Sequence, residues 1–246
     1  MNEEVQLSPT ALNQYIKCGL AFKVQYILKA TPPEPATPQM QKGSRIHEAI
    51  AAGYDLDDPD EQGMVERARA YLLACSGDPI METKHGDRFN PGRMAGEFYG
   101  HPAVAVFDVH WLEPSMAIDW KTGAFNTRYT NSQEVQAYIL AELYSQKYGQ
   151  PLEQMSFVFL PDGTTYEARC IGVPKVRKRI ATMIEKAVRG IEGGEFEKKS
   201  TPLCRHCVWR TYCWPTFRAQ DASDLRPFTR KAYRESTNRN LTDFRG

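Results

Sequence analysis

Apolar residues recur at helical spacing near the start of the chain. A first helix is expected from Ser8, whose side chain can cap the amides that follow it, while Pro9 suits the first turn. This helix runs to about Lys17, or on to Leu28. Residues 31–38 contain four prolines in eight positions, which predicts an extended linker.

Two further helices are expected before the first clear strands. One follows Gly43 and carries apolar residues on one face, and the next covers residues 64–74. The acidic stretch 55–63 between them predicts a loop. Residues 76–101 predict a longer loop with one short strand near residues 97–99.

The clearest strand signal lies in residues 103–121. The run AVAVFDVHW is rich in β-branched and aromatic residues, a Glu-Pro-Ser turn follows, and MAIDWK is expected to return beside it. Residues 155–160 and 164–173, joined by a Pro-Asp-Gly turn, predict another strand pair. Amphipathic helices are expected over residues 133–148 and 174–192.

Composition places the chain among ordinary globular proteins. Its 246 residues are 41% apolar and 25% charged, and no apolar run approaches the ~20 residues of a membrane span. The first ten residues are polar and acidic, unlike a secretory signal. A cytoplasmic protein with no membrane association is the expectation.

Charge is unevenly distributed although the net charge is only +1. Residues 169–218 hold twelve Lys or Arg against four acids, whereas residues 55–66 hold six acids and no base. The basic half is either a surface that faces phosphates or a solvated helix face. The candidate phosphate contacts are Lys175, Arg177, Lys178, Arg179 and Arg189.

Two carboxylates and one ammonium converge in the predicted hairpin. Asp108 lies in its first strand, and Asp119 and Lys121 lie in its second strand on one face, because strand side chains alternate. Buried carboxylates need a compensating cation, and Mg²⁺ or Mn²⁺ prefers oxygen ligands. This chemistry suits phosphodiester hydrolysis. The alternative is a simple exposed pair between Asp119 and Lys121 on an edge strand.

The order of these motifs resembles the RecB-type nucleases of the PD-(D/E)XK superfamily, including CRISPR-associated RecB-like exonucleases and related phage exonucleases. It comprises Gly-Ser-Arg-Ile-His47 on a helix, an upstream Glu97, Asp108, the run IDWKTG, and a helix with Gln136 and Tyr138. The resemblance implies an α/β core with a small mixed sheet flanked by helices. An iron–sulfur cap formed by both ends of the chain would complete it.

The resemblance also implies roles for individual residues. His47, Asp108, Asp119 and the backbone carbonyl of Trp120 would bind the metal, and Lys121 would be catalytic. A Gln and a Tyr on the next helix, here Gln136 and Tyr138, would contact DNA or support the site. The usual spacing of that Gln would place it at position 134, which is Glu here, and Ala105 replaces a frequent glycine.

Cysteines form the second constellation. Cys204, Cys207 and Cys213 have metal-binding spacing, which suits zinc or an iron–sulfur cluster, while Cys75 and Cys170 are expected to be small buried residues. The fourth ligand is His206 or the remote Cys18. The resemblance implies a 4Fe–4S cluster on Cys18 and the triplet.

These features give a domain plan and a function. Residues 1–30 are expected to be a cap segment with the first cluster cysteine, 31–198 the nuclease core, 199–220 the cluster segment and 221–246 a polar tail. The expected function is metal-dependent exonuclease action on DNA, with single-stranded or duplex ends as substrate. The alternatives are a DNA-binding scaffold with a degenerate site, or a zinc-stabilised nucleic-acid module.

The biological setting implied by the resemblance is CRISPR adaptation, or phage or host recombination and repair. Its partners would be a CRISPR integrase, a helicase or a single-strand annealing protein. No P-loop occurs in the sequence, so any unwinding would have to come from such a partner.

Overall fold

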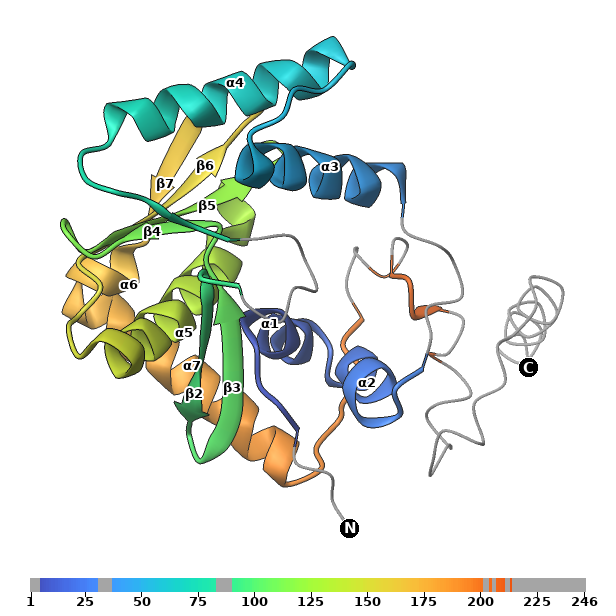
Figure 1. Cartoon of the computed structure of the whole chain (residues 1–246). Helices are drawn as coiled ribbons and strands as arrows, with labels where there is room; N and C mark the ends of the chain where they lie inside the picture. The colour runs from blue at the N-terminus through green and yellow to red at the C-terminus, as the bar shows by residue number, and fades with distance from the viewer. Residues whose placement is uncertain are drawn as a thin grey trace, which may run out of the picture. The chain divides into compact units, whose positions relative to one another are not determined.

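A five-stranded mixed sheet lies at the centre of the structure, a computed structural model (Figure 1). The described residues are 5–30, 37–82, 90–200, 204, 207–210 and 213. The strands in spatial order are β1 (Ile80–Met81), β4 (Val109–Trp111), β5 (Met116–Lys121), β6 (Gln154–Phe159) and β7 (Thr164–Glu167). Only β5 and β6 run parallel, and the other neighbours are antiparallel. The expected small mixed sheet is confirmed.

The expected long strand over residues 103–111 is wrong, because the chain breaks at Phe107 and Asp108. The first half is β3 (His101–Val106), which pairs with β2 (Arg93–Phe98) in a separate two-stranded sheet. The second half is β4, which forms the expected hairpin with β5. At the break, the Phe107 amide donates to the carbonyl of Gly92, and the Asp108 carbonyl accepts from Glu82. Asp108 therefore lies at a strand junction rather than inside a strand.

Two helices, α3 (Pro38–Ala52) and α4 (Pro59–Ala74), cover one face of the central sheet (Figure 1). Both begin earlier than expected, because Thr37 and Asp58 cap their first turns ahead of a proline. The core between these helices and the sheet is apolar. Its buried members are Ile46, Ala49, Ile50, Val65, Ala68, Val109, Trp111, Ile118, Trp120, Val158 and Leu160.

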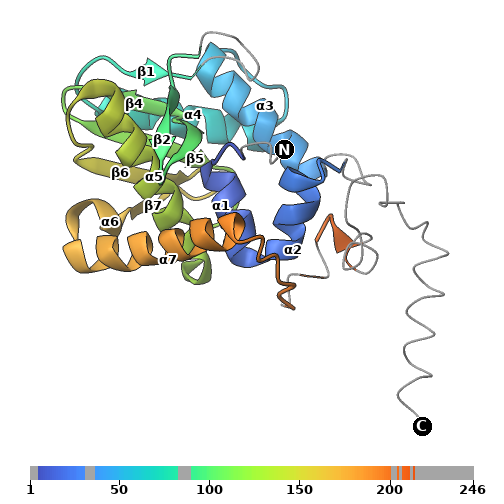
Figure 2. The same ribbon diagram turned by 90° about the horizontal axis from the view of Figure 1, so that it is seen from below.

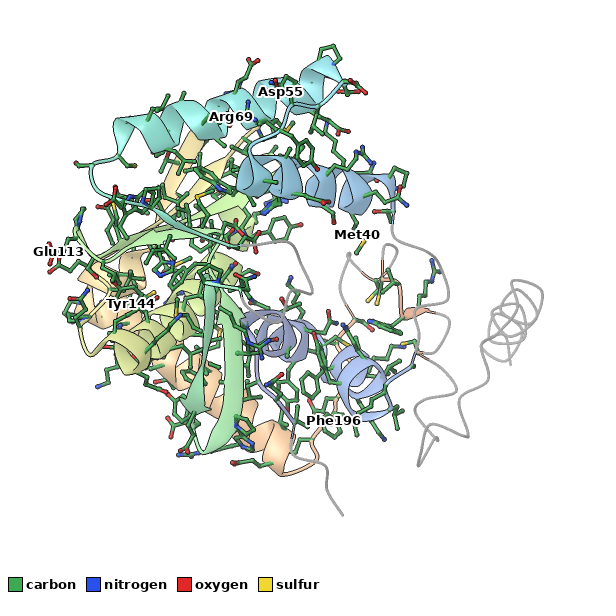
Figure 3. All side chains as sticks on the ribbon, viewed as in Figure 1. Met40, Asp55, Arg69, Glu113, Tyr144 and Phe196 are labelled. Atoms are coloured by element: carbon green, nitrogen blue, oxygen red, sulfur yellow. The ribbon has the colours of Figure 1, made fainter. Side chains whose placement is uncertain are left out.

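The acidic segment before α4 is tied to that helix rather than left as a free loop. Asp55 forms an ion pair of 2.6 Å with Arg69, and the two side chains lie together in Figure 3. The carboxylate of Asp58 accepts hydrogen bonds from the amides of Asp60 and Glu61. Two of the acidic residues in this stretch therefore stabilise α4, Asp58 by capping its first turn and Asp55 by pairing with Arg69.

The helices α5 (Thr130–Tyr148), α6 (Arg169–Gly172) and α7 (Pro174–Glu192) lie on the other side of the sheet from α3 and α4 (Figures 1 and 2). A short 3₁₀ turn, η2 (Thr127–Tyr129), leads into α5. The predicted helices over 133–148 and 174–192 are confirmed. The expected strand over 164–173 ends at Glu167, because the chain turns there into α6.

The chain divides into two compact units, one formed by residues 1–13 with 36–189 and the other by 14–35 with 190–246. The sheet and its helices belong to the first unit, apart from the last three residues of α7. The helix α1 (Pro9–Lys17) crosses from one unit to the other. Among the described residues, no helix combines the length and the apolarity that a bilayer crossing needs.

The second unit contains α2 (Gly19–Phe22) and a π-helical turn, η1 (Lys23–Ile27). The expected end of the first helix at about Lys17 is confirmed, whereas the alternative extension to Leu28 is interrupted at Cys18, whose backbone is extended. Within this unit, Phe22 stacks on Phe196, labelled in Figure 3, and Tyr15 packs edge-on against Phe22. The predicted tail 221–246 and most of the proline-rich linker lie outside the described residues.

A candidate metal centre beside a half-buried lysine

The candidate site lies where β5 ends, next to the junction between β3 and β4. Side chains alternate along β5, so Ile118 and Trp120 enter the core under α3 and α4. Asp119 and Lys121 face the opposite side, toward α5. The amide of Trp120 donates to Oδ2 of Asp108 at 2.6 Å, which anchors that carboxylate beside the strand.

Three side chains from separate elements form a potential ligand group. His47 comes from α3, Glu82 directly follows β1, and Asp108 lies at the strand junction. Nδ1 of His47 is 3.4 Å from Oδ1 of Asp108 and 3.8 Å from Oε1 of Glu82. One ligand atom from each residue lies within 4.8 Å of the others. His47 and Asp108 were expected as ligands from the sequence, whereas Glu82 was not.

Asp119, Lys121 and Gln136 form a second, adjoining group. Nζ of Lys121 is 2.5 Å from Oδ1 of Asp119 and donates to Oε1 of Gln136 at 3.1 Å. The amide nitrogen of Gln136 donates in turn to Oδ2 of Asp119. Lys121 also lies over the ring of Phe157, 5.3 Å from its centroid. The ammonium group is therefore fixed by a carboxylate, an amide and an aromatic face.

Burial and opposing charges set the protonation of these groups. Burial alone would lower the pKa of His47, but Asp108, Glu82 and Asp119 raise it to about 11. Burial is the largest single influence on Asp108 and would raise its pKa, but the charge and hydrogen bond of His47, the charge of Lys121 and the Trp120 amide together keep that pKa below its usual range. Burial raises the pKa of Asp119 despite Lys121, and nearby Asp108 raises it further. Three carboxylates thus face two cationic side chains.

This donor set fits a divalent cation. Oxygen ligands suit Mg²⁺ and Mn²⁺, and one imidazole favours the transition metal without excluding Mg²⁺. Ligand atoms about 2.1 Å from one ion lie up to about 4.2 Å apart, which includes the separations from His47 to Asp108 and to Glu82. To bind the cation, His47 has to release its proton, and the cation would then supply the positive charge beside the carboxylates in its place. Asp119 and the Trp120 carbonyl remain proposed ligands rather than members of this group.

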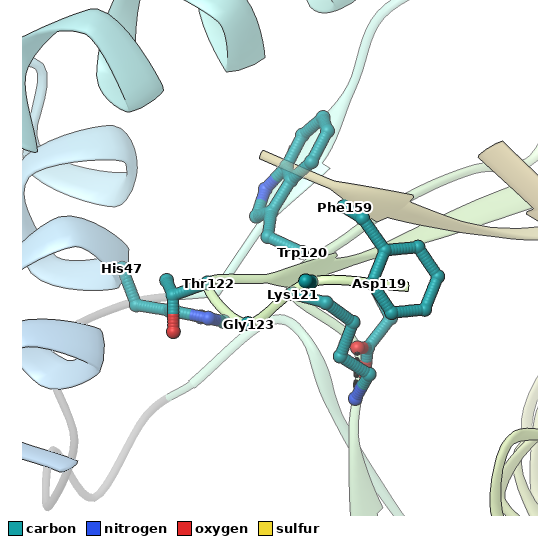
Figure 4. A pocket seen from close by; sticks show the side chains of 8 residues that line it. His47, Asp119, Trp120, Lys121, Thr122, Gly123 and Phe159 are labelled. Carbon is teal, nitrogen blue, oxygen red and sulfur yellow. Dashed lines mark ion pairs between the residues drawn. The ribbon is translucent and has the colours of Figure 1, made fainter. Parts of the chain in front are cut away.

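Two hollows give access to these side chains. The smaller, about 340 Å³, is lined by Asp119, Lys121, Phe159 and the segment after Lys121 (Figure 4). The larger, about 1040 Å³, runs along one face of α3 and reaches Glu82 and Asp108. His47 and Thr122 line both. A substrate can therefore approach the lysine and the ligand group together.

Three other residues singled out in the sequence lie in different surroundings. Tyr138 packs edge-on against Phe98 and under the guanidinium of Arg177, 4.9 Å from its ring centroid. Glu134 is buried and accepts hydrogen bonds from the amides of Arg169 and Cys170. Glu97 is exposed on β2, and its backbone pairs with Gln146. None of these contacts joins the ligand group.

The basic helix α7 presents some of its predicted phosphate contacts more openly than others. Lys175, Lys178 and Arg179 are exposed. Arg177 is paired with Glu142 of α5, and Arg189 with Glu185 of its own helix. The first three side chains are thus the more available contacts for a phosphate backbone.

The four candidate cluster cysteines all belong to the second unit. Burial raises the pKa of Cys207, and the neighbouring thiols of Cys18, Cys204 and Cys213 raise it further. Cys18 and Cys207 also pack against the same small core of Ala21, Val24 and Trp209. The competing ligand His206 lies outside the described residues.

The remaining cysteines lie elsewhere in the fold. Cys170 is fully buried, as expected, whereas Cys75 is only half-buried at the end of α4.

Fold and site together define an α/β protein with an acidic, cation-receptive centre next to a fixed lysine. The family model described as the PD-(D/E)XK nuclease superfamily matches residues 6–91 and 115–214, more than half of the chain. The protein belongs to this superfamily and is accordingly a nuclease. The matched ranges contain His47, Glu82, Asp119 and Lys121, but not Asp108.

Two other comparisons add little. The solved structure "Crystal structure of SSO0001" aligns with 87% of this chain and 88% of its own, at 14% identity and a TM-score of 0.47. A search of curated proteins found no match.

Proposed function

We propose that this protein is a divalent-metal-dependent DNA exonuclease of the RecB type. The observation that carries the proposal is the ligand group of His47, Glu82 and Asp108 beside a lysine fixed by Asp119 and Gln136. Nuclease chemistry follows from the superfamily. The metal, the preference for DNA ends and the residue roles are the proposed parts.

Each side chain has a role that its position supports. His47, Glu82 and Asp108 would hold the cation, with Asp119 and the Trp120 carbonyl as further ligands. When bound, the cation polarises the scissile phosphate and makes a nearby water more acidic. Lys121 orients that water or steadies the phosphate. Gln136 keeps the lysine in place, since its amide bonds both Lys121 and Asp119.

The exposed bases of α7 would contact the phosphate backbone of DNA. Such contacts position the nucleic acid without reading its sequence. Free ends as the point of attack, and a role in CRISPR adaptation or in phage or host recombination, rest on the resemblance to RecB-type exonucleases. A CRISPR integrase, a helicase or a single-strand annealing protein would be the partner.

The proposal includes a 4Fe–4S cluster on Cys18, Cys204, Cys207 and Cys213. Its support is the gathering of these four thiols around Cys207 in one unit, although the triplet is 186 residues from Cys18. Soft thiolates suit iron–sulfur clusters and zinc alike. Metal analysis of protein prepared without air decides between them, with roughly four irons per chain expected.

The catalytic part is tested by cleavage of end-labelled linear DNA and of matched circular DNA, with Mg²⁺, Mn²⁺ or EDTA. Wild-type protein should degrade only the linear form, and only with metal. Asp119→Ala and Lys121→Ala should abolish cleavage while the fold survives. Asp162→Ala, in an exposed turn, is the matched control and should cleave normally. Robust cleavage by Asp119→Ala would refute the site, and cutting of circles would refute the exonuclease assignment.

A further inference from the structure

Thr122 occupies a special position in the site, at the end of β5 directly after Lys121. It is half-buried, and it lines both the hollow that contains Lys121 and the hollow that reaches Glu82 and Asp108. Among the residues that the structure describes, His47 is the only other one that lines both. A group placed between the lysine and the metal ligands must therefore pass close to Thr122.

The hydroxyl group of Thr122 is closely approached by α3. A Cβ atom added to Gly43 would lie 3.1 Å from Oγ1 of Thr122, which is tighter than ordinary packing. Gly43 lies inside α3, where glycine is less favourable than alanine. Because Gly43 has no side chain, the Thr122 hydroxyl has space beside α3. Gly43 itself lies one helical turn before His47 on the same helix.

This hydroxyl is also available. Among the described residues, none forms a hydrogen bond with Oγ1 of Thr122. Ser44, the other hydroxyl-bearing residue that lines either hollow, donates to the carbonyl of Met40. Lys121 is already engaged by Asp119 and Gln136. The lining residues therefore contain one uncommitted hydroxyl donor where a phosphate would lie.

We propose that Thr122 is a further catalytic residue whose hydroxyl donates a hydrogen bond to a non-bridging oxygen of the scissile phosphate. This inference rests on the proposed nuclease function and names one of its substrate contacts. The hydroxyl is neutral, so it adds a donor without adding charge next to the cation. The contact fixes the phosphate between His47 and Lys121.

The test compares single-turnover cleavage of a linear oligonucleotide by wild type, Thr122→Val and Thr122→Ser. Valine keeps the branched shape and loses the donor, so its rate should fall roughly 10- to 100-fold, the usual effect of one hydrogen bond to a charged group. Serine restores the hydroxyl and should recover most of the rate. Thr127→Val, on exposed η2, is the matched control and should be as fast as wild type.

A second measurement separates phosphate contact from a structural role. A substrate with one phosphorothioate at the cleaved linkage, resolved into its two diastereomers, replaces one non-bridging oxygen at a time by sulfur, a weak acceptor. The diastereomer whose sulfur replaces the oxygen that accepts from Thr122 should be cut at the same rate by wild type and by Thr122→Val. The Mn²⁺ concentration for half-maximal rate and the melting temperature should not change in the variant.

Each outcome has a distinct meaning. A Thr122→Val rate equal to wild type would overturn the inference while the proposed function stands. An equal slowing with the oxygen substrate and both diastereomers, or a raised Mn²⁺ requirement, would also overturn it, because the hydroxyl would then act on the fold or the metal. A wild-type protein that cleaves nothing would remove the proposed function and this inference together.

Discussion

At the scale of single residues, the site depends on acids that differ sharply in surroundings. Glu82 faces His47 at 3.8 Å, whereas Glu97 is exposed on the two-stranded sheet. Both precede Asp108 in the sequence, and only their tertiary positions separate them. An acid within reach of the imidazole can share a cation with it.

The first prediction tests Glu82 against Glu97. Glu82→Gln should raise the Mn²⁺ concentration needed for cleavage by at least about tenfold. Tenfold is the lower end of the loss in metal affinity when a group that supports the metal ligands is mutated, and a direct ligand should cost at least as much. Glu97→Gln should leave it unchanged. The measurements are metal titrations of cleavage and direct Mn²⁺ binding by calorimetry. Equal metal affinity in Glu82→Gln and wild type would remove Glu82 from the ligand group.

His110 gives a prediction about acid stability. Its ring is buried between Phe107 and Tyr144, Nε2 lies 2.9 Å from the Tyr148 hydroxyl, and Nδ1 has no partner among the described residues. Burial, with a smaller effect from Lys147, lowers its pKa to about 4. The unfolded chain therefore binds a proton at higher pH than the folded chain does. Stability from the neutral ring is complete above pH ~6.5 and is lost as pH falls toward 4.

His110→Phe should remove this dependence. Between pH 6.5 and 5 the free energy of unfolding of the variant should fall less steeply than that of wild type, by ~1.4 kcal/mol per pH unit at most. Urea denaturation at both pH values measures the difference. Parallel pH profiles for the two proteins would show that His110 does not titrate as its burial requires.

At the scale of elements, helix α5 contacts both the candidate site and the start of α6. Gln136 on this helix faces Asp119 and Lys121. Glu134, two residues earlier, points to α6 and caps its first amides. One helix thus supports Lys121 and, from a different face, holds the chain that follows β7.

Glu134 is accordingly predicted to be a structural carboxylate. It is 2% exposed and accepts hydrogen bonds from two amides and the Tyr166 hydroxyl. Glu134→Gln places an NH₂ group against donors, so unfolding should become easier by about 1–3 kcal/mol. Thermal melting against exposed Glu153→Gln measures this. If Glu134→Gln loses cleavage while its melting temperature stays unchanged, Glu134 belongs to the candidate site instead.

The exposed face of α7 gives a prediction about DNA binding. Lys178→Glu and Arg179→Glu should each weaken DNA binding to a similar extent for unrelated sequences. Each should also make the negative slope of log affinity against log salt shallower by about one. Arg93→Glu, an exposed base on β2, is the control and should bind like wild type. Fluorescence anisotropy at several salt concentrations gives the slopes. Unchanged slopes would place the DNA path away from α7.

At the scale of the whole molecule, the second unit is built from two segments far apart in the sequence. Residues 14–35 and 190–246 meet through Phe22, Phe196 and the Trp209 core. Such a small unit has little apolar core, and proteins of this kind use metal sites to gain stability. The proposed cluster would supply that stabilisation.

Cys18→Ser should therefore lose iron and colour, and limited proteolysis should then cut within residues 14–35 and 190–246. Metal binding at His47 should persist, because that site belongs to the first unit. Cys75→Ser, at the end of α4, should keep its iron. Normal iron in Cys18→Ser would mean that the triplet uses another fourth ligand, such as His206.

The sequence by itself determined the elements whose patterns are local. Helix α7, the hairpin of β4 and β5, and the mixed α/β class follow from periodicity and turn residues, which act between near neighbours. The alternation of side chains also fixed Asp119 and Lys121 on one face of β5. These features needed no knowledge of distant contacts.

Tertiary structure decided what depends on distant segments. Residues 103–111 read as one strand, but pairing with two different partners splits them at Asp108, since β3 bonds to β2 and β4 to β5. Glu82 had no sequence signal, because it reaches His47 only through the pairing of β1 with β4. The gathering of Cys18 with the triplet likewise depends on packing between the chain's two ends. Sequence spacing encodes chemistry within a segment, and the folded chain sets which segments share a site.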